Sequence, residues 1–239
     1  MEWIRVMVGS QSHLGDGLIH VWRISLSKVR HLAPTLRARL KNDETARADR
    51  FVRPIDRDNY TTGRAILREI LGSYLQTEPG QIEIETGEFG KPIVSNSMNL
   101  NNIQFNLSHS GDVCVIAVRR SAAVGIDIEK VRDDVVVEDL ANQYFAADEI
   151  AELRTVPENQ RRLAFFLGWT RKEAYVKAKA GGLQIPLDQF VVTLTPGLPA
   201  ELRGLDSGRW SIISLDPGPG YAGALVTEKS RFSASYYEY

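Results

Sequence analysis

Four ionisable side chains in the second half of the chain could hold a metal ion and act on a phosphate. Residues 124–130 alternate between apolar and other side chains, which predicts a strand with Asp127 and Glu129 together on one face. Glu173 and Lys177 are four residues apart in a helical pattern, so they share one face of a helix. Three carboxylates suit a hard cation such as Mg²⁺ or Mn²⁺, and a lysine suits an anionic ligand.

Each of these patterns also has an ordinary structural explanation. Paired carboxylates repel each other unless a cation is present, but the same pattern occurs on exposed strand faces with a lysine such as Lys130 nearby. A glutamate and a lysine at this helical spacing stabilise a helix by about 0.3–0.5 kcal/mol without any ligand. Trp169 lies on the same predicted helix face, and a tryptophan there is usually part of the core. The metal-site interpretation therefore depends on neighbouring groups.

Two predicted turns supply such groups. Gly90-Lys91-Pro92 offers a cation on a restrained backbone, and a Ser-His-Ser-Gly turn is predicted beside a strand at residues 108–111. Adjacent serine and histidine residues do not by themselves form a nucleophile and its base, because such a pair is defined in space. We interpret Lys91 and His109 as phosphate-binding residues, and the alternative for His109 is a core histidine bonded to the backbone.

Composition narrows the class of protein. The 239 residues carry a formal net charge of −1, which predicts no general affinity for nucleic acid, and 43% are hydrophobic, as is ordinary for a globular protein. No apolar stretch approaches the roughly 20 residues that span a bilayer, so we expect no membrane association. Because Glu2 and Arg5 interrupt the region where a signal peptide would be apolar, we expect a cytoplasmic protein.

Hydrophobic periodicity predicts two halves that each mix strands with helices. This pattern favours an α+β fold over a doubly wound parallel sheet. The polar stretch at residues 95–102 is interpreted as a connection between an N-terminal half, 1–102, and a C-terminal half, 103–239. The predicted strands are 18–26, 81–85, 103–107, 113–118, 123–131, 190–194, 210–215 and 222–226, and the predicted helices are two within 36–75, broken near Pro54, then 137–146 and 160–180.

The order of the motifs resembles the 4′-phosphopantetheinyl transferase superfamily, in its larger monomeric class of the surfactin synthetase activating enzyme type. Each motif is weak alone, but five in family order are specific, and the resemblance covers most of the chain. A less specific N-terminal pattern, at residues 47–51 and 60–68, also resembles the family. The motifs are Gly90-Lys91-Pro92, Phe-Asn-Leu-Ser-His-Ser at 105–110, Val-Gly-Ile-Asp-Ile-Glu-Lys at 124–130, Tyr144-Phe145 with Glu149, and Trp-Thr-Arg-Lys-Glu-Ala-Tyr-Val-Lys at 169–177.

The resemblance implies two similar α+β halves related by a pseudo-twofold axis, with coenzyme A in the cleft between them. It assigns metal ligation to Asp127, Glu129 and Glu173, and it suggests that Glu149 lies near the metal. His109 and Arg47 are expected near the 3′-phosphate of the coenzyme. The full set of expected coenzyme contacts is Arg47, Gly90, Lys91, Pro92, Ser108, His109 and Lys177.

The reaction implied is Mg²⁺-dependent transfer of the phosphopantetheine arm of coenzyme A to a serine of an acyl or peptidyl carrier protein, releasing adenosine 3′,5′-bisphosphate. Glu173 is the candidate base and Lys177 the catalytic cation. The family also implies a monomer with a basic docking surface for acidic carriers, to which Arg132, Arg154 and Arg171 could contribute. A noncatalytic module that binds coenzyme A or a carrier protein, and a Mg²⁺-dependent nucleotide phosphohydrolase, are the alternatives.

Overall fold

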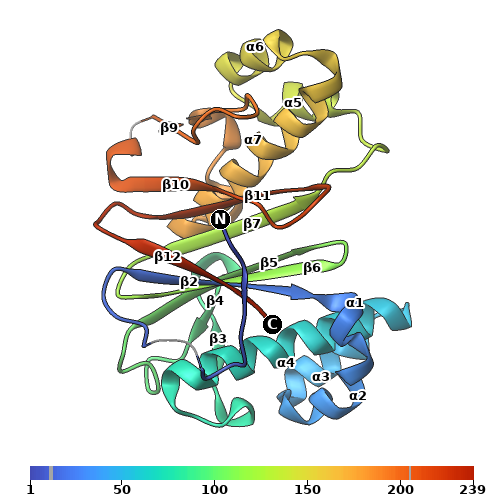
Figure 1. The fold of residues 1–239 in the computed structure, drawn as a ribbon, viewed down its shortest axis with the longest axis vertical. Helices are drawn as coiled ribbons and strands as arrows, with labels where there is room; N and C mark the ends of the chain where they lie inside the picture. Colours follow the sequence, from blue (N-terminus) through green and yellow to red (C-terminus); the bar gives the residue numbers. More distant parts are fainter. Residues whose placement is uncertain (11–12, 205) are drawn as a thin grey trace.

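Two β-sheets pack against each other at the centre of the molecule, and a 22-residue helix covers the outer side of each sheet (Figure 1). The computed structural model describes residues 1–10, 13–204 and 206–239. One sheet has the strand order β1-β12-β2-β6-β5 and the other β10-β11-β7. The fold is therefore α+β with two halves, as predicted.

The bounds of the elements are as follows. The strands of the first sheet are β1 (Ile4–Arg5), β12 (Ser233–Glu238), β2 (Leu18–Ser25), β6 (Val113–Arg120) and β5 (Ile103–Ser110). Those of the second are β10 (Trp210–Leu215), β11 (Tyr221–Glu228) and β7 (Val124–Lys130). Two short pairs are β3 (Ile84–Thr86) with β4 (Pro92–Val94), and β8 (Val191–Val192) with β9 (Leu202–Arg203). The helices are α1 (Leu26–Val29), α2 (Ala33–Leu36), α3 (Asn42–Ala48), α4 (Pro54–Leu75), α5 (Val137–Tyr144), α6 (Ala147–Thr155) and α7 (Glu158–Lys179).

The long helices begin and end where backbone chemistry requires. Pro54 occupies the first position of α4, where its missing N–H costs no hydrogen bond. The residues after the two helices, Gln76 and Ala180, adopt the left-handed conformation that ends many helices.

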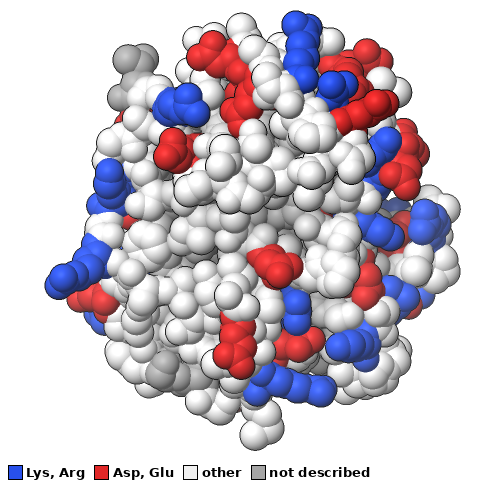
Figure 2. Space-filling view, turned by 45° about the horizontal axis from the view of Figure 1, so that its top comes forward, with Lys and Arg blue, Asp and Glu red and all other residues white. Residues whose placement is uncertain are grey.

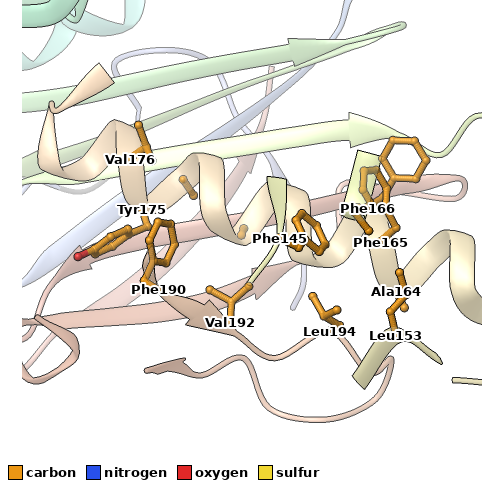
Figure 3. Packing of buried hydrophobic residues seen from close by; sticks show 14 of the residues in the cluster. Phe145, Leu153, Ala164, Phe165, Phe166, Tyr175, Val176, Phe190, Val192 and Leu194 are labelled. Atoms are coloured by element: carbon orange, nitrogen blue, oxygen red, sulfur yellow. The ribbon is translucent and has the colours of Figure 1, made fainter. Parts of the chain in front are cut away.

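Along α7, Phe165 stacks on Phe145 with ring centroids 5.1 Å apart (Figure 3). The aromatic contacts fix α7 between its sheet and the smaller helices.

The division between the halves follows the sheets. The expected boundary after residue 102 lies between β4 and β5. Hydrogen bonds join β5 and β6 to β2, so these two strands belong to the first sheet although they follow that boundary. β12, which the sequence pattern did not predict, pairs parallel with β2 and returns the C-terminal strand to that sheet (Figure 1).

The turn predicted at residues 108–111 is instead strand up to Ser110, because β5 pairs with β6 along its whole length. The helix α6 was also not predicted.

The surface carries both signs of charge. On the face in Figure 2, basic and acidic side chains are interspersed around a broad area without charges. Within the described residues, no helix is both long and apolar enough to cross a membrane.

Gly125 allows α7 to lie close to β7. A Cβ atom at this position would overlap the backbone of Ala174 and Ala178, which belongs to the helix and cannot move independently. We expect Gly125→Ala to lower the free energy of unfolding by about 3 kcal/mol, as overpacked cores do. Urea unfolding measures this, with Gly80→Ala as the control because its Cβ would meet open space. Equal stability of the two variants would contradict the close approach.

His20 makes the fold sensitive to acid. It is fully buried on β2, with Nδ1 2.8 Å from the hydroxyl of Tyr74, and burial lowers the pKa of His20 to about 4. Between that value and the ordinary pKa of about 6.5, the unfolded chain binds a proton that the folded protein does not. The free energy of unfolding should therefore fall as pH falls through this window, by about 1.4 kcal/mol per unit. In His20→Gln this part of the pH dependence should be absent, and in the control His31→Gln, at an exposed position, it should remain.

Candidate active site

β7 carries two carboxylates on the face opposite its core contacts. Val124, Ile126 and Ile128 pack between the two sheets, which confirms the predicted alternation of this strand. Asp127 is buried and Glu129 is half-buried. The strand therefore holds both carboxylates on a backbone that is anchored in the core.

α7 brings the third carboxylate and a lysine to the same place. The Nζ of Lys177 lies 2.6 Å from Oδ1 of Asp127 and 3.3 Å from Oγ of Ser108. Burial and the negative charge of Asp127 raise the pKa of Glu173. Burial, followed by the charge of Asp127, raises the pKa of Glu129 as well. These shifts show that the carboxylates predicted from two separate elements lie within electrostatic reach of one another.

The oxygen atoms at this place suit a divalent cation. Oδ2 of Asp127 is buried and has no hydrogen-bond partner among the described residues. Burial raises the pKa of Asp127 although Lys177 opposes the shift, so negative charge here is costly until a cation compensates it. In the part of the chain that the structure describes, no three His, Cys, Asp or Glu residues already form a complete ligand cluster. The Lys177 ammonium instead neutralises Asp127.

The Gly90-Lys91-Pro92 turn reaches across to the second half. Nζ of Lys91 donates hydrogen bonds to the carbonyl oxygens of Val124 and Lys177, both at 2.9 Å. Burial lowers the pKa of Lys91 to about 8. An ammonium has three donors, so these two bonds leave one for a ligand. Gly90 has a φ of +85°, a conformation that favours glycine.

A cavity of about 310 Å³ lies at the boundary between the halves. Lys91 and Gln104 line it from the first half, and Ala123 and Ala178 line it from the second. Lys91, which lines the cavity, also donates to the carbonyl oxygen of Lys177, so the cavity adjoins the residues described above.

Two family models match consecutive parts of the chain. The model of the N-terminal region of 4′-phosphopantetheinyl transferases matches residues 22–121, and the model of the 4′-phosphopantetheinyl transferase superfamily matches residues 123–226. The chain belongs to the 4′-phosphopantetheinyl transferase superfamily. The family predicted from the motif order is thereby confirmed, and the two models meet where the two sheets divide.

Curated relatives agree with this assignment. The chain is 37% identical over 221 residues to the 4′-phosphopantetheinyl transferase HetI of Nostoc sp., covering 92% of both chains. It is 35% identical to the 4′-phosphopantetheinyl transferase psf-1 of Bacillus pumilus, over 78% of both chains. It is 30% identical to the 4′-phosphopantetheinyl transferase Sfp of Bacillus subtilis, over 77% of this chain and 80% of that one. The protein is a phosphopantetheinyl transferase.

The transferase carries the remaining predicted coenzyme contacts on its first half. His109 is exposed and follows Leu107 on the strand face that packs towards α4. Arg47 is exposed on α3, with its guanidinium 5.4 Å from the ring centre of Tyr60. Pro92 begins β4. Ser108 is on the same strand as His109, β5, but on its opposite face, where its hydroxyl donates to Asp127 at 2.7 Å.

Two residues expected near the site lie elsewhere. Glu149 is fully buried and forms an ion pair with Lys172 at 2.8 Å, on the side of α7 that faces α6 and β8. Arg171 is 2% exposed and donates to the carbonyl oxygen of Thr193, so it is not available for carrier docking. Adjacent helix positions point about 100° apart, so Arg171 and Lys172 reach these other partners while Lys177 of the same helix contacts Asp127 of β7.

Two polar residues of β5 were missed as part of the site. The hydroxyl of Ser110 donates to Oε2 of Glu129 at 2.7 Å, and Oδ1 of Asn106 accepts the N–H of Ile126 at 2.8 Å. The available signal was polar side chains at every second position of a strand, 106, 108 and 110, which places them on one face.

Proposed function

We propose that this transferase binds Mg²⁺ through Asp127, Glu129 and Glu173, and moves the phosphopantetheine arm of coenzyme A to a serine hydroxyl of an acyl or peptidyl carrier protein. A bond forms between the serine oxygen and the phosphorus that carries the pantetheine arm. The bond from that phosphorus to the bridging oxygen of the pyrophosphate breaks, and adenosine 3′,5′-bisphosphate leaves.

One observation carries the proposal: burial and the charges of Asp127 and Glu129 on β7 raise the pKa of Glu173 on α7, and Nζ of Lys177 lies 2.6 Å from Oδ1 of Asp127, at the boundary between the halves. Mn²⁺ could replace Mg²⁺ because both prefer oxygen ligands. A bound Mg²⁺ would supply positive charge to the pyrophosphate and to the leaving phosphate.

The protein's own groups have separate tasks. Lys177 supplies positive charge beside Asp127, and Lys91 has one donor left for phosphate. Glu173 is the proposed base for the serine proton, directly or through a water molecule. Burial and neighbouring charge raise its pKa, which makes its carboxylate a stronger base. Ligation of a metal lowers the basicity of a carboxylate, so the two roles of Glu173 compete.

We propose the remaining contacts from the family resemblance. Arg47 and His109 would hold the 3′-phosphate, and their exposure on the first half leaves both accessible to a ligand. Gly90, Pro92 and Ser108 would line the coenzyme site. Arg132 and Arg154 would contribute to carrier docking, and both are exposed. The monomeric state and cytoplasmic location stay predictions.

Intact mass spectrometry of a carrier protein tests the proposal. An apo carrier is incubated with the transferase, coenzyme A and Mg²⁺, beside an Asp127→Ala control. The expected result is one added phosphopantetheine, lost with EDTA and in the variant. Release of adenosine 3′,5′-bisphosphate at the same rate without any carrier would favour a phosphohydrolase. Binding of coenzyme A or carrier without any transfer, across several unrelated carriers, would favour a noncatalytic module.

A further inference from the structure

The two sheets pack against each other, and they also meet along one edge, where β5 lies beside β7. At this edge, side chains of β5 accept the hydrogen bonds that the backbone of a pairing strand would otherwise accept. β5 ends the first sheet and β7 ends the second, so each has backbone groups that no strand of its own sheet satisfies on that side. Three side chains of β5 accept the N–H groups of β7. These bonds run from Ile126 to Oδ1 of Asn106 at 2.8 Å, from Ile128 to Oγ of Ser108 at 3.4 Å, and from Lys130 to Oγ of Ser110 at 3.0 Å.

The two serines of this ladder also contact the carboxylates. A serine hydroxyl has one proton, and here its oxygen already accepts a backbone N–H. The proton of Ser108 goes to Oδ1 of Asp127 at 2.7 Å, and the proton of Ser110 goes to Oε2 of Glu129 at 2.7 Å. Each serine therefore ties a carboxylate to the backbone of the next residue on β7.

Ser110 has the larger consequence of the two. Asp127 is buried and also held by Lys177, whereas Glu129 is half-exposed and has a longer side chain with more rotamers. Its hydrogen bond to Ser110 selects one orientation and leaves Oε1 for another partner. Groups that hold a ligand side chain in this way commonly change metal affinity when removed.

We propose that Ser110 is a positioning residue that holds Glu129 in the orientation that binds the divalent cation, and that Ser108 does the same for Asp127. The inference rests on the proposed metal site. It also means that a strand of the first half orients the metal ligands of the second, so the cation site requires both halves.

The test measures Mn²⁺ binding to the full chain by electron paramagnetic resonance of free Mn²⁺, without coenzyme A or carrier. We expect Ser110→Ala to raise the dissociation constant about 10–100-fold, and Ser110→Thr, which keeps the hydroxyl, to stay close to the wild type. In the transfer assay, Ser110→Ala should raise the Mg²⁺ concentration needed for half-maximal rate and recover most of kcat at saturating Mg²⁺.

Two matched controls separate positioning from simple strand joining. Asn106→Ala removes a bond of the same ladder that touches no carboxylate. Thr195→Ala removes a hydroxyl that donates to a carboxylate elsewhere, Oε1 of Glu152 at 2.8 Å. Both should leave Mn²⁺ affinity within about twofold of the wild type, far less than the 10–100-fold loss expected when a group that orients a ligand is removed.

Unchanged Mn²⁺ affinity in Ser110→Ala would overturn the inference while leaving the metal site intact. Equal weakening in Asn106→Ala and Ser110→Ala would also overturn it, because the ladder would then act only by joining the sheets. Wild-type binding that Asp127→Ala does not reduce would refute the proposed metal site and the inference together.

Discussion

Replacing Glu173 by glutamine is expected to lower the transfer rate about 10²–10³-fold without loss of stability. The substitution removes a proposed metal ligand and base but keeps the size of the side chain. Burial and the charges of Asp127 and Glu129 raise the pKa of Glu173 in the folded protein. The folded protein therefore binds its proton more tightly than the unfolded chain, and ionisation lowers the free energy of unfolding as pH rises through this pKa.

Two measurements check this prediction. At neutral pH and without metal, Glu173→Gln should unfold at the same or a higher urea concentration than the wild type. Mg²⁺ should stabilise the wild type, because a ligand that binds only the folded state raises the free energy of unfolding, and should stabilise the variant less. Most of the turnover surviving in Glu173→Gln at saturating Mg²⁺ would count against Glu173 as a base.

Replacing Lys172 by methionine is expected to cost about 3–5 kcal/mol of stability, because it leaves the charge of Glu149 buried without its partner. Both side chains of this ion pair are fully buried. Nζ of Lys172 also donates to the carbonyl oxygens of Leu187 and Phe190, both at 2.6 Å. Burial is the largest effect on both groups, and it raises the pKa of Glu149 and lowers that of Lys172.

Urea unfolding of the single and double variants tests the ion pair. Adding Glu149→Gln to Lys172→Met should recover part of the loss, since glutamine removes the charge and keeps an oxygen for the N–H of Val192. Lys28→Met is the control: its ion pair with Glu238 spans 3.5 Å and Lys28 is 70% exposed, so the change should stay below about 1 kcal/mol. A small loss in Lys172→Met, similar to the control, would contradict the structural role.

Local periodicity was sufficient for the parts of the fold that have strong patterns. The strands that became β2, β6, β7, β10 and β11 and the long helices α4 and α7 were predicted near their observed bounds. The short helix α6 and the strand β12 were not. β12 has the sequence Ser-Ala-Ser-Tyr-Tyr-Glu, which alternates weakly, and its place beside β2 comes from pairing across more than 200 residues. Sequence patterns report neighbours in the chain and carry little information about such pairing.

The sequence by itself determined the family, the alternation of β7 and the common helix face of Glu173 and Lys177, because each depends on residues close together in the chain. Only the tertiary structure decided which groups meet. It joined Ser110 to Glu129, directed Lys91 to two backbone carbonyls, and buried Glu149 with Lys172. The physical reason is that these contacts form where α7 packs on β7 and where the edges of two sheets meet, and such packing is set by the whole core.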